Sequence, residues 1–276
     1  MGRLDGKVAL VTGGASGIGR SICLTFAKEG ATIVCNDIAV ETAQKVLDEC
    51  GQSKHGFAVK ADVSKSRQVA AMFERIKKKY GRLDVLVNNA GIGLDNPVVR
   101  ARFNKVLARQ QAEVTKEGKI KTSLETTQNL TDEDWDRMLG VHLNGTFYCT
   151  REALKLMEKQ GSGKIVNIAS ICGMTGCVGA PHYSAAKAGI MGLTRSVARE
   201  VIVRGVYVNA IAPGYIDTPM TEAVSDTVRR TIELATPAGR FGSPQDIANL
   251  AIYLASEESN FVVGQVMSPN GGYVIA

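Results

Sequence analysis

The chain alternates short runs of consecutive apolar residues with longer stretches in which apolar residues recur every three or four positions. A run that is apolar at every position is typical of a strand buried on both faces, as in a parallel sheet between two helical layers. The longer stretches predict the crossover helices that parallel strands need. The pattern therefore predicts a doubly wound, Rossmann-like α/β fold with a parallel sheet. The predicted strands are Val8–Val11, Thr32–Cys35, Phe57–Val59, Val85–Val87, Ile165–Ile168 and Val206–Ile211.

Two helices are predicted in more detail. Thr131 is a favourable N-cap, and the three acidic residues that follow it suit the positive end of a helix, which we expect to continue to about Gln160. Another helix is expected from about His182 to Val203. No repeat, low-complexity tract or linker divides the 276 residues, so residues 1–276 are predicted to form a single domain.

Composition excludes several classes of protein. The chain has 33 Lys and Arg against 27 Asp and Glu, a formal charge of +6, and only 5% aromatic residues, and no basic run is interleaved with aromatic residues. Nucleic acid is therefore not an expected partner. No apolar stretch approaches the roughly 18 residues of a membrane span, and no room for a signal peptide precedes the first strand, so we expect a cytoplasmic protein without membrane contact.

The cysteines do not form a metal-binding pattern. Six of them are scattered along the chain without paired spacing, and four fall within apolar periodic segments. We therefore expect reduced thiols in the core and no metal site. They are Cys23, Cys35, Cys50, Cys149, Cys172 and Cys177.

A glycine-rich turn follows the first predicted strand. Glycines at 13, 17 and 19 surround Ser16 and Ile18 and open a helix. Glycine allows the backbone to turn tightly and approach a phosphate, and free N–H groups at a helix start attract negative charge. We expect this turn to bind the pyrophosphate of a dinucleotide through Gly13, Ser16, Gly17, Ile18 and Gly19.

An acidic residue ends the second strand. Asp37 lies 18 residues after Gly19, near the spacing at which a carboxylate accepts hydrogen bonds from the adenosine ribose. A 2′-phosphate there would be repelled, and neither Ser16 nor Ile38 supplies a compensating cation. The sequence therefore predicts NAD as the cofactor, although a strand-end Asp can also serve only to form a turn.

Taken together, the motifs resemble the short-chain dehydrogenase/reductase family in its compact branch. The resemblance covers nearly the whole chain, and the motifs occur in the family's order. They are Thr12–Gly19, Asp62-Val63, Asn88–Gly91, Ser170, Tyr183–Lys187, Asn209–Gly214 and Asn270–Gly272.

The resemblance implies further cofactor contacts. Asp62 and Val63 would flank the adenine, and Asn89, Ala90 and Gly91 would line the cofactor's ribose. The segment from Pro213 to Thr218 would hold the nicotinamide carboxamide, with Pro213, Gly214, Ile216 and Thr218 as contacts. The resemblance also implies a homotetramer built by long helices.

The remaining motif residues suit acid–base chemistry on an alcohol. Oxidising an alcohol needs a base, and a free tyrosine with a pKa of about 10 is neutral at pH 7. Lys187 follows Tyr183 by four residues, so the two side chains share a helix face and the ammonium group can stabilise a phenolate. Ser170 follows a strand and can hydrogen-bond the substrate oxygen, a role that the resemblance also implies. An exposed helical pair is the simpler interpretation of Tyr183 and Lys187 taken alone.

One position departs from the family pattern. The family usually has an asparagine before Leu-x-Gly in the long central helix, where it holds a water that links the lysine to solvent. Here that position is His142, and Asn144 lies two residues on, about 200° around the helix. An imidazole can replace the amide in such a relay, so His142 is a candidate catalytic residue. The alternative is a histidine that only packs in the helix.

Residues 92–130 exceed the usual family length and are predicted to be a basic, partly helical insertion. Asn96 suits an N-cap, Pro97 the first turn and Gly118 the helix end. One face would carry Val99, Phe103, Val106, Gln110 and Val114, and another a basic stripe of Arg102, Lys105 and Arg109. We expect the stripe to recognise an anionic substrate group such as a coenzyme A phosphate, although solubility or a subunit contact would also explain it.

These features predict an NAD-dependent enzyme that interconverts a secondary alcohol and a ketone. The resemblance reaches 3-oxoacyl reductases, which favours a 3-hydroxyacyl or 3-oxoacyl thioester of coenzyme A or a carrier protein. It also reaches dehydrogenases of cyclic or aromatic secondary alcohols. A catalytically silent NAD-binding partner subunit is the alternative from another class.

Overall fold

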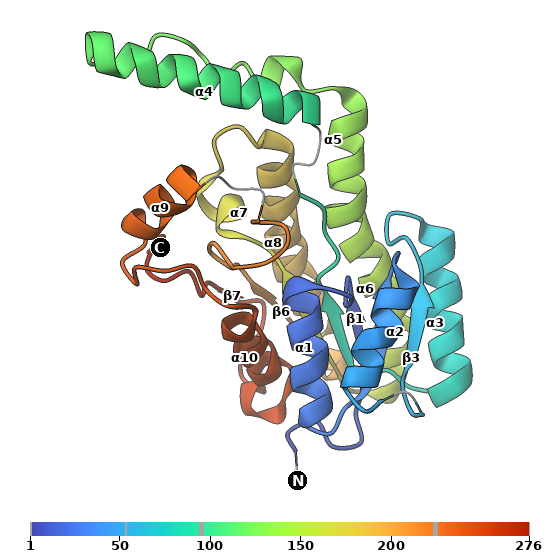
Figure 1. Cartoon of the computed structure of the whole chain (residues 1–276). Coiled ribbons are helices and arrows are strands. Elements are labelled where there is room, and N and C mark those ends of the chain that lie inside the picture. The colour runs from blue at the N-terminus through green and yellow to red at the C-terminus, as the bar shows by residue number, and fades with distance from the viewer. Residues whose placement is uncertain (1, 53, 94–96, 223–225, 276) are drawn as a thin grey trace.

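The computed structural model describes residues 2–52, 54–93, 97–222 and 226–275. Seven parallel strands form one sheet in the order β3-β2-β1-β4-β5-β6-β7, with helices on both sides (Figure 1). The prediction of a single-domain, doubly wound α/β fold is confirmed. The strands are β1 (Val8–Thr12), β2 (Thr32–Asp37), β3 (Phe57–Lys60), β4 (Val85–Asn88), β5 (Gly163–Ile168), β6 (Val206–Ile211) and β7 (Val266–Met267).

The helices follow the predicted alternation with the strands. The longer ones are α1 (Gly17–Lys28), α2 (Val40–Glu49), α3 (Ser66–Tyr80), α4 (Pro97–Glu117), α5 (Asp132–Leu139), α6 (Gly145–Gln160), α8 (Pro181–Val201), α9 (Asp226–Ala235) and α10 (Pro244–Ala255). Shorter elements are α7 (Ile171–Thr175), η1 (Thr127–Asn129), η2 (Gly140–Asn144), η3 (Ile202–Arg204) and η4 (Glu257–Ser259).

The strands are apolar on consecutive positions because each separates two cores. In β4, Val85 and Val87 face the cluster formed with α1, α2 and α10, whereas Leu86 faces the cluster formed with α3, α6 and α8. Successive side chains of a strand point to opposite faces, so both layers need apolar partners. Because all the strand pairs are parallel, the carboxyl ends of the strands lie at one edge of the sheet.

The helix predicted from Thr131 to Gln160 is divided into three parts. Its start is confirmed, because the Thr131 hydroxyl accepts a hydrogen bond from the N–H of Asp134 at 3.1 Å. A π-helical segment, η2, then separates α5 from α6. Such a segment has one more residue per turn than its surroundings, and it places His142 in the interior while Asn144 is exposed.

The prediction that all six cysteines are reduced core thiols is wrong for two of them. Cys172 and Cys177 form a disulfide with a Cα–Cα distance of 4.9 Å. Cys23, Cys35 and Cys149 are buried free thiols, as expected, and Cys50 is a half-buried free thiol. The bonded pair lies in and beside the five-residue helix α7, where no long apolar pattern holds the side chains in the core.

The predicted insertion forms an extension that we call the arm, defined as residues 97–130. Its helix α4 projects beyond the sheet and its covering helices (Figure 1), and Gly118 ends it with a φ of +70° as predicted. No side chain described in the arm, from 101 to 130, is fully buried. Phe103 packs on Gly179, where an added Cβ would lie 2.4 Å from the ring. The predicted N-cap Asn96 and the side chain of Val99 lie outside the described residues.

The expected faces of α4 are found in part. Phe103, Val106 and Gln110 are partly buried, but Val114 is 47% exposed. In the basic stripe, Arg102 pairs with Glu125 at 3.0 Å and Arg109 pairs with Glu113 at 3.4 Å. These acidic partners reduce the positive potential that the stripe was expected to present.

Candidate active site

The sequence-predicted site residues gather at the carboxyl edge of the sheet. The glycine-rich turn follows β1, and the Asn89–Gly91 segment follows β4, which is the neighbour of β1. The chain runs outward on both sides from this pair of strands, so the pair is the topological switch point of the sheet. Ligands of doubly wound sheets bind at this point.

The glycine-rich turn requires glycine at two positions. Gly13 has a φ of +62°, and an added Cβ would lie 2.8 Å from the Cα of Ala90. At Gly19 an added Cβ would lie 2.1 Å from the carbonyl oxygen of Gly13. Side chains at these positions would push the turn away from both β4 and α1.

The turn fits the pyrophosphate of a nicotinamide dinucleotide. Helix α1 begins at Gly17, and the side chain of its N-cap, Ser16, makes no capping hydrogen bond. The N–H groups of the first helical turn are therefore left without the usual side-chain cap at a positive helix end. The opposite wall is Thr218, whose methyl group would lie 3.3 Å from a Cβ added at Gly17.

Thr12 joins the two segments of the predicted cofactor site, a role that the sequence did not predict. Its hydroxyl accepts hydrogen bonds from the N–H groups of Asn89 at 3.0 Å and Ala90 at 3.1 Å. The Asn89 amide in turn donates to the carbonyl groups of Thr12 and Gly13 at 3.0 and 2.9 Å. These bonds fix the glycine-rich turn and the Asn89–Gly91 segment, the two predicted cofactor contacts, to each other. The signal in the sequence was a threonine ending a buried, otherwise apolar strand.

Asp37 stands at the tip of the glycine-rich turn. One carboxylate oxygen accepts a hydrogen bond from the N–H of Ala15 at 3.1 Å, and the other accepts from Ala39 at 3.0 Å. Arg20, a basic residue of α1, is held in an ion pair with Glu49 at 2.5 Å. The carboxylate is thus fixed by the backbone beside the turn, and Arg20 is engaged elsewhere.

The other predicted cofactor contacts extend along the same edge. Val63 is buried against Gly145, and the Asp62 carboxylate accepts from the N–H of Ser64 at 2.9 Å. The carbonyl of Pro213 accepts from the N–H of Ile171 at 3.1 Å. Further along that segment, Gly214 packs on Asn270, Ile216 pairs with Gly242, and Thr218 meets the glycine-rich turn. The segment therefore spans from Ser170 to the turn.

The three residues predicted for proton transfer come together. Ser170 follows β5 and is the N-cap of α7, and Tyr183 and Lys187 lie one turn apart on α8. The Ser170 side chain lies within hydrogen-bonding reach of the Tyr183 hydroxyl. The Nζ atom of Lys187 lies 5.6 Å from the centre of the Tyr183 ring and donates to the carbonyl of Ile168 at 2.8 Å. Two hydroxyl groups thus converge where a substrate oxygen could be bound.

Burial changes the pKa values of this group. It raises the pKa of Tyr183, and the hydrogen bond from Ser170 only partly opposes this effect. It also lowers the pKa of Lys187 to about 7. The expectation that the ammonium group lowers the pKa of Tyr183 is therefore not met, because a lysine with this pKa is only about half charged at pH 7. Protonated Tyr183 is suited to donate a proton to a carbonyl oxygen.

A buried polar network beneath this group also escaped prediction. The amide of Asn88 donates to Thr150 at 3.1 Å and to Asn167 at 2.8 Å, and Asn167 donates to Thr194 at 2.9 Å. The network joins β4 and β5 to α6 and α8. Its member Asn167 immediately precedes Ile168, whose carbonyl accepts the hydrogen bond from Lys187. Polar residues at the ends of apolar strands, where Asn88 and Asn167 lie, were the available signal.

His142 lies against the Tyr183 ring, edge to face, with ring centres 5.3 Å apart. Its Nε2 atom lies 3.1 Å from the backbone nitrogen and 3.0 Å from the carbonyl oxygen of Ile92. Its Nδ1 atom is buried without a hydrogen-bond partner among the described residues. Burial, together with the charge of Lys187, lowers the pKa of His142 to about 3, so the ring is neutral. It covers Gly91, where a Cβ would lie 2.5 Å from Cε1.

Comparisons with known proteins agree with this site. Residues 7–229 match the short chain dehydrogenase family, and the chain belongs to that family. Its members use a nicotinamide cofactor, so this chain is an oxidoreductase. It is 40% identical to the 3-oxoacyl-[acyl-carrier-protein] reductase of Thermotoga maritima, over 99% of this chain and 100% of the relative. It is 35% identical to the reductase of the same description from Escherichia coli, over 97% of each.

A solved structure gives the same result for the fold. A crystal structure described as that of a candidate gluconate dehydrogenase from Agrobacterium tumefaciens superposes with a TM-score of 0.84 at 31% identity, covering 99% of this chain and 98% of that one. Among the residues that the structure describes, no helix is long and apolar enough to cross a membrane.

Proposed function

We propose that the protein interconverts a 3-oxoacyl thioester and its 3-hydroxyacyl form with NAD(H). The observation that carries the proposal is the convergence of the Ser170 and Tyr183 hydroxyl groups beside Lys187, at the edge that also holds the glycine-rich turn. The curated relatives described as 3-oxoacyl-[acyl-carrier-protein] reductases support the thioester. We retain cytoplasmic residence as a prediction.

In the reduction, the bound nicotinamide ring would supply hydride to the carbonyl carbon. Ser170 donates a hydrogen bond to the carbonyl oxygen, where negative charge develops. Tyr183 transfers its proton to that oxygen, and the raised pKa keeps this proton available beforehand. A proton from solvent is then taken up by Lys187, whose positive charge stabilises the phenolate until Tyr183 is protonated again. In the oxidation these steps run in reverse.

A coupled assay of 3-hydroxyacyl thioesters against alicyclic secondary alcohols tests the proposal. We expect kcat/KM to favour the thioesters. A preference for the alicyclic alcohols would instead identify a dehydrogenase of cyclic alcohols. Cofactor binding without turnover of any of them would identify a silent binding subunit.

We propose NAD as the cofactor because Asp37 is fixed beside the turn and Arg20 is engaged by Glu49. We expect NAD to bind at least about tenfold more tightly than NADP, because a 2′-phosphate would face a carboxylate. The change Asp37→Ala should remove most of this preference, and Glu41→Ala, on the first turn of α2, should retain it. Titration of both cofactors measures the effect. Equal affinities in the unaltered protein would contradict the assignment.

We propose that His142 belongs to the proton path from Lys187. Its Nε2 atom can donate to the Ile92 carbonyl or accept from the Ile92 N–H, so either neutral tautomer has a partner on that side. We expect His142→Asn to retain activity and His142→Leu to lose about tenfold or more in kcat. The pH dependence of kcat is the measurement. An unchanged profile and rate in His142→Leu would reduce the role of this residue to packing.

We propose that the basic stripe of the arm recognises the anionic part of the thioester. The pairs with Glu125 and Glu113 weaken the stripe, so the expected effect is modest. Changing Arg102, Lys105 and Arg109 to Gln should raise KM for a coenzyme A thioester about threefold at low salt, and less at high salt. KM for a small uncharged ketone should not change. The matched control changes Lys77 and Lys78 of α3; an equal effect there would contradict specific recognition.

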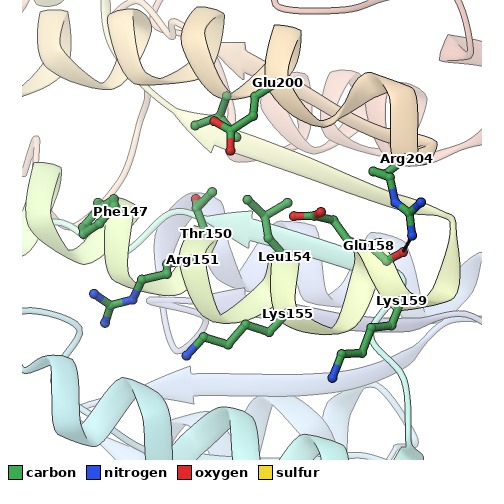
Figure 2. A pocket seen from close by; sticks show the side chains of 10 residues that line it. Phe147, Thr150, Arg151, Leu154, Lys155, Glu158, Lys159, Glu200 and Arg204 are labelled. Atoms are coloured by element: carbon green, nitrogen blue, oxygen red, sulfur yellow. Dashed lines mark hydrogen bonds between the residues drawn. The ribbon is translucent and has the colours of Figure 1, made fainter.

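We propose a homotetramer in which α6 and α8 contact a second copy. A hollow runs between these helices, and Figure 2 shows charged side chains along it next to the exposed Phe147. Arg204 donates to the carbonyl of Glu158 across it at 3.1 Å. Light scattering should give about four times the 29.4 kDa of one chain. A monomer in solution would contradict this arrangement.

A further inference from the structure

The loop between Ser170 and Tyr183 carries the disulfide. We call residues 171–180 the cystine loop; it contains α7, the Cys172–Cys177 bond and the strongly exposed Val178. Both bonded cysteines are partly exposed, unlike the buried thiols of Cys23 and Cys35. The bond is therefore accessible to small thiols from solvent.

The first half of the cystine loop is attached to two of the proposed catalytic residues. The N–H of Cys172 donates to the Oγ atom of Ser170 at 3.1 Å. Gly173 lies directly on α8, where an added Cβ would be 2.6 Å from the carbonyl carbon of Lys187. Movement of this half would therefore disturb Ser170 or Lys187.

The second half borders Tyr183 and the arm. The N–H of Cys177 donates to the hydroxyl of Ser184, the residue after Tyr183, at 2.9 Å. Gly179 is covered by Phe103 of the arm. Apart from these contacts, this half includes the exposed Val178 and two glycines with positive φ, at 176 and 179. Besides the backbone, the disulfide is a second covalent link between it and the well-packed first half.

We propose that Cys172–Cys177 is a reversible redox site and that its reduction by a dithiol loosens the cystine loop and weakens substrate binding. A single five-residue helix is not stable by itself, so the cross-link contributes to the order of the loop. The packing of Gly173 and the cap at Ser170 hold the first half in both states. The second half, beside the place where the substrate oxygen would bind, gains freedom when the bond opens.

Reduction of the disulfide by a dithiol needs no group that takes part in the enzyme's own reaction. A thiolate of the dithiol attacks one sulfur of the cystine, forming a mixed disulfide and releasing the other cysteine as a thiolate. The second thiol of the reagent then attacks the mixed disulfide. The dithiol leaves as a cyclic disulfide, and two electrons and two protons pass to Cys172 and Cys177. The oxidised reagent reverses these steps.

Full-length protein equilibrated with reduced or oxidised dithiothreitol provides the test. Alkylation and mass spectrometry should find two additional modified thiols in the reduced sample, both in the peptide containing residues 171–180. Amide hydrogen exchange in residues 176–180 should become faster. In steady-state assays KM should rise about fivefold with little change in kcat, as expected for lost substrate binding.

Matched variants separate this effect from general reduction of the protein. The double variant Cys172→Ser/Cys177→Ser should show the reduced protein's KM in both buffers, whereas Cys50→Ser, at a half-buried free thiol, should respond as the unaltered protein does. Equal exchange rates and equal KM in the two buffers would overturn the proposal, as would absence of the bond after oxidation. Alkylation and hydrogen exchange do not depend on turnover, so they decide this proposal even if the proposed substrate is wrong.

Discussion

Replacing Tyr183 by Phe is expected to lower kcat by at least about a hundredfold, the contribution of a positioned proton-transfer group. Phe preserves the ring that packs against His142 at 5.3 Å, so cofactor affinity should change less than about threefold. Rapid-quench or steady-state assays give kcat, and fluorescence titration gives the cofactor Kd.

Another tyrosine supplies the control for this variant. Tyr253 lies on α10, away from Ser170 and Lys187 in the chain and in the fold, and Tyr253→Phe removes a hydroxyl of the same kind. It should retain the activity of the unaltered enzyme. If Tyr183→Phe kept more than a few per cent of kcat, another group would have to supply the proton.

Replacing Lys187 by Met should abolish most activity and yet stabilise the fold. Burial lowers the pKa of Lys187 from 10.5 to about 7, so at pH 7 the unfolded chain binds a proton that the folded chain holds only in part. A pKa shift of that size means that the buried lysine destabilises the folded protein by about 4 kcal/mol at neutral pH. Removing the lysine also removes its hydrogen bond to Ile168, which costs the variant about 1 kcal/mol of stability. We expect a net gain near 3 kcal/mol in the free energy of unfolding.

The pH dependence of this gain is specific to the buried lysine. Because the folded pKa is lowered, the unaltered protein loses stability as pH falls from 10.5 to 7 and has its full stability above 10.5. The advantage of Lys187→Met should therefore shrink by about 3 kcal/mol between pH 7 and pH 10. Urea unfolding at several pH values measures it. A gain independent of pH would show that Lys187 is already charged in the folded protein.

The sequence predicts the sheet well because each strand packs against a hydrophobic core on both faces, which makes its residues apolar at consecutive positions. Every predicted strand is present, and Val206–Ile211 has the predicted bounds. Strand β7, with two residues, and helix α7, with five, are too short to show a periodic pattern. The π-helical segment at His142 was missed for another reason, because one additional residue in a turn leaves the apolar pattern on either side unchanged.

The sequence predicted the residues of the site more completely than their pKa values. The order of motifs along the chain was sufficient to bring Ser170, Tyr183 and Lys187 together. The raised pKa of Tyr183 depends on how much water is excluded around it, which no spacing reveals. Likewise, the disulfide depends on the path of the chain between Cys172 and Cys177, and spacing alone did not distinguish them from the four free thiols.

The exposed position of the arm bears on how such an enzyme diversifies. From 101 to 130, where the structure describes the arm's side chains, no residue belongs to the buried clusters on either side of the sheet, so a lineage could acquire, shorten or lose this segment without repacking the interior. The contact between Phe103 and Gly179 would constrain that history, because a side chain at 179 would displace the ring. Among descendants that keep the arm, an aromatic residue at position 103 and a glycine at position 179 should therefore covary, although the two positions lie far apart in the sequence.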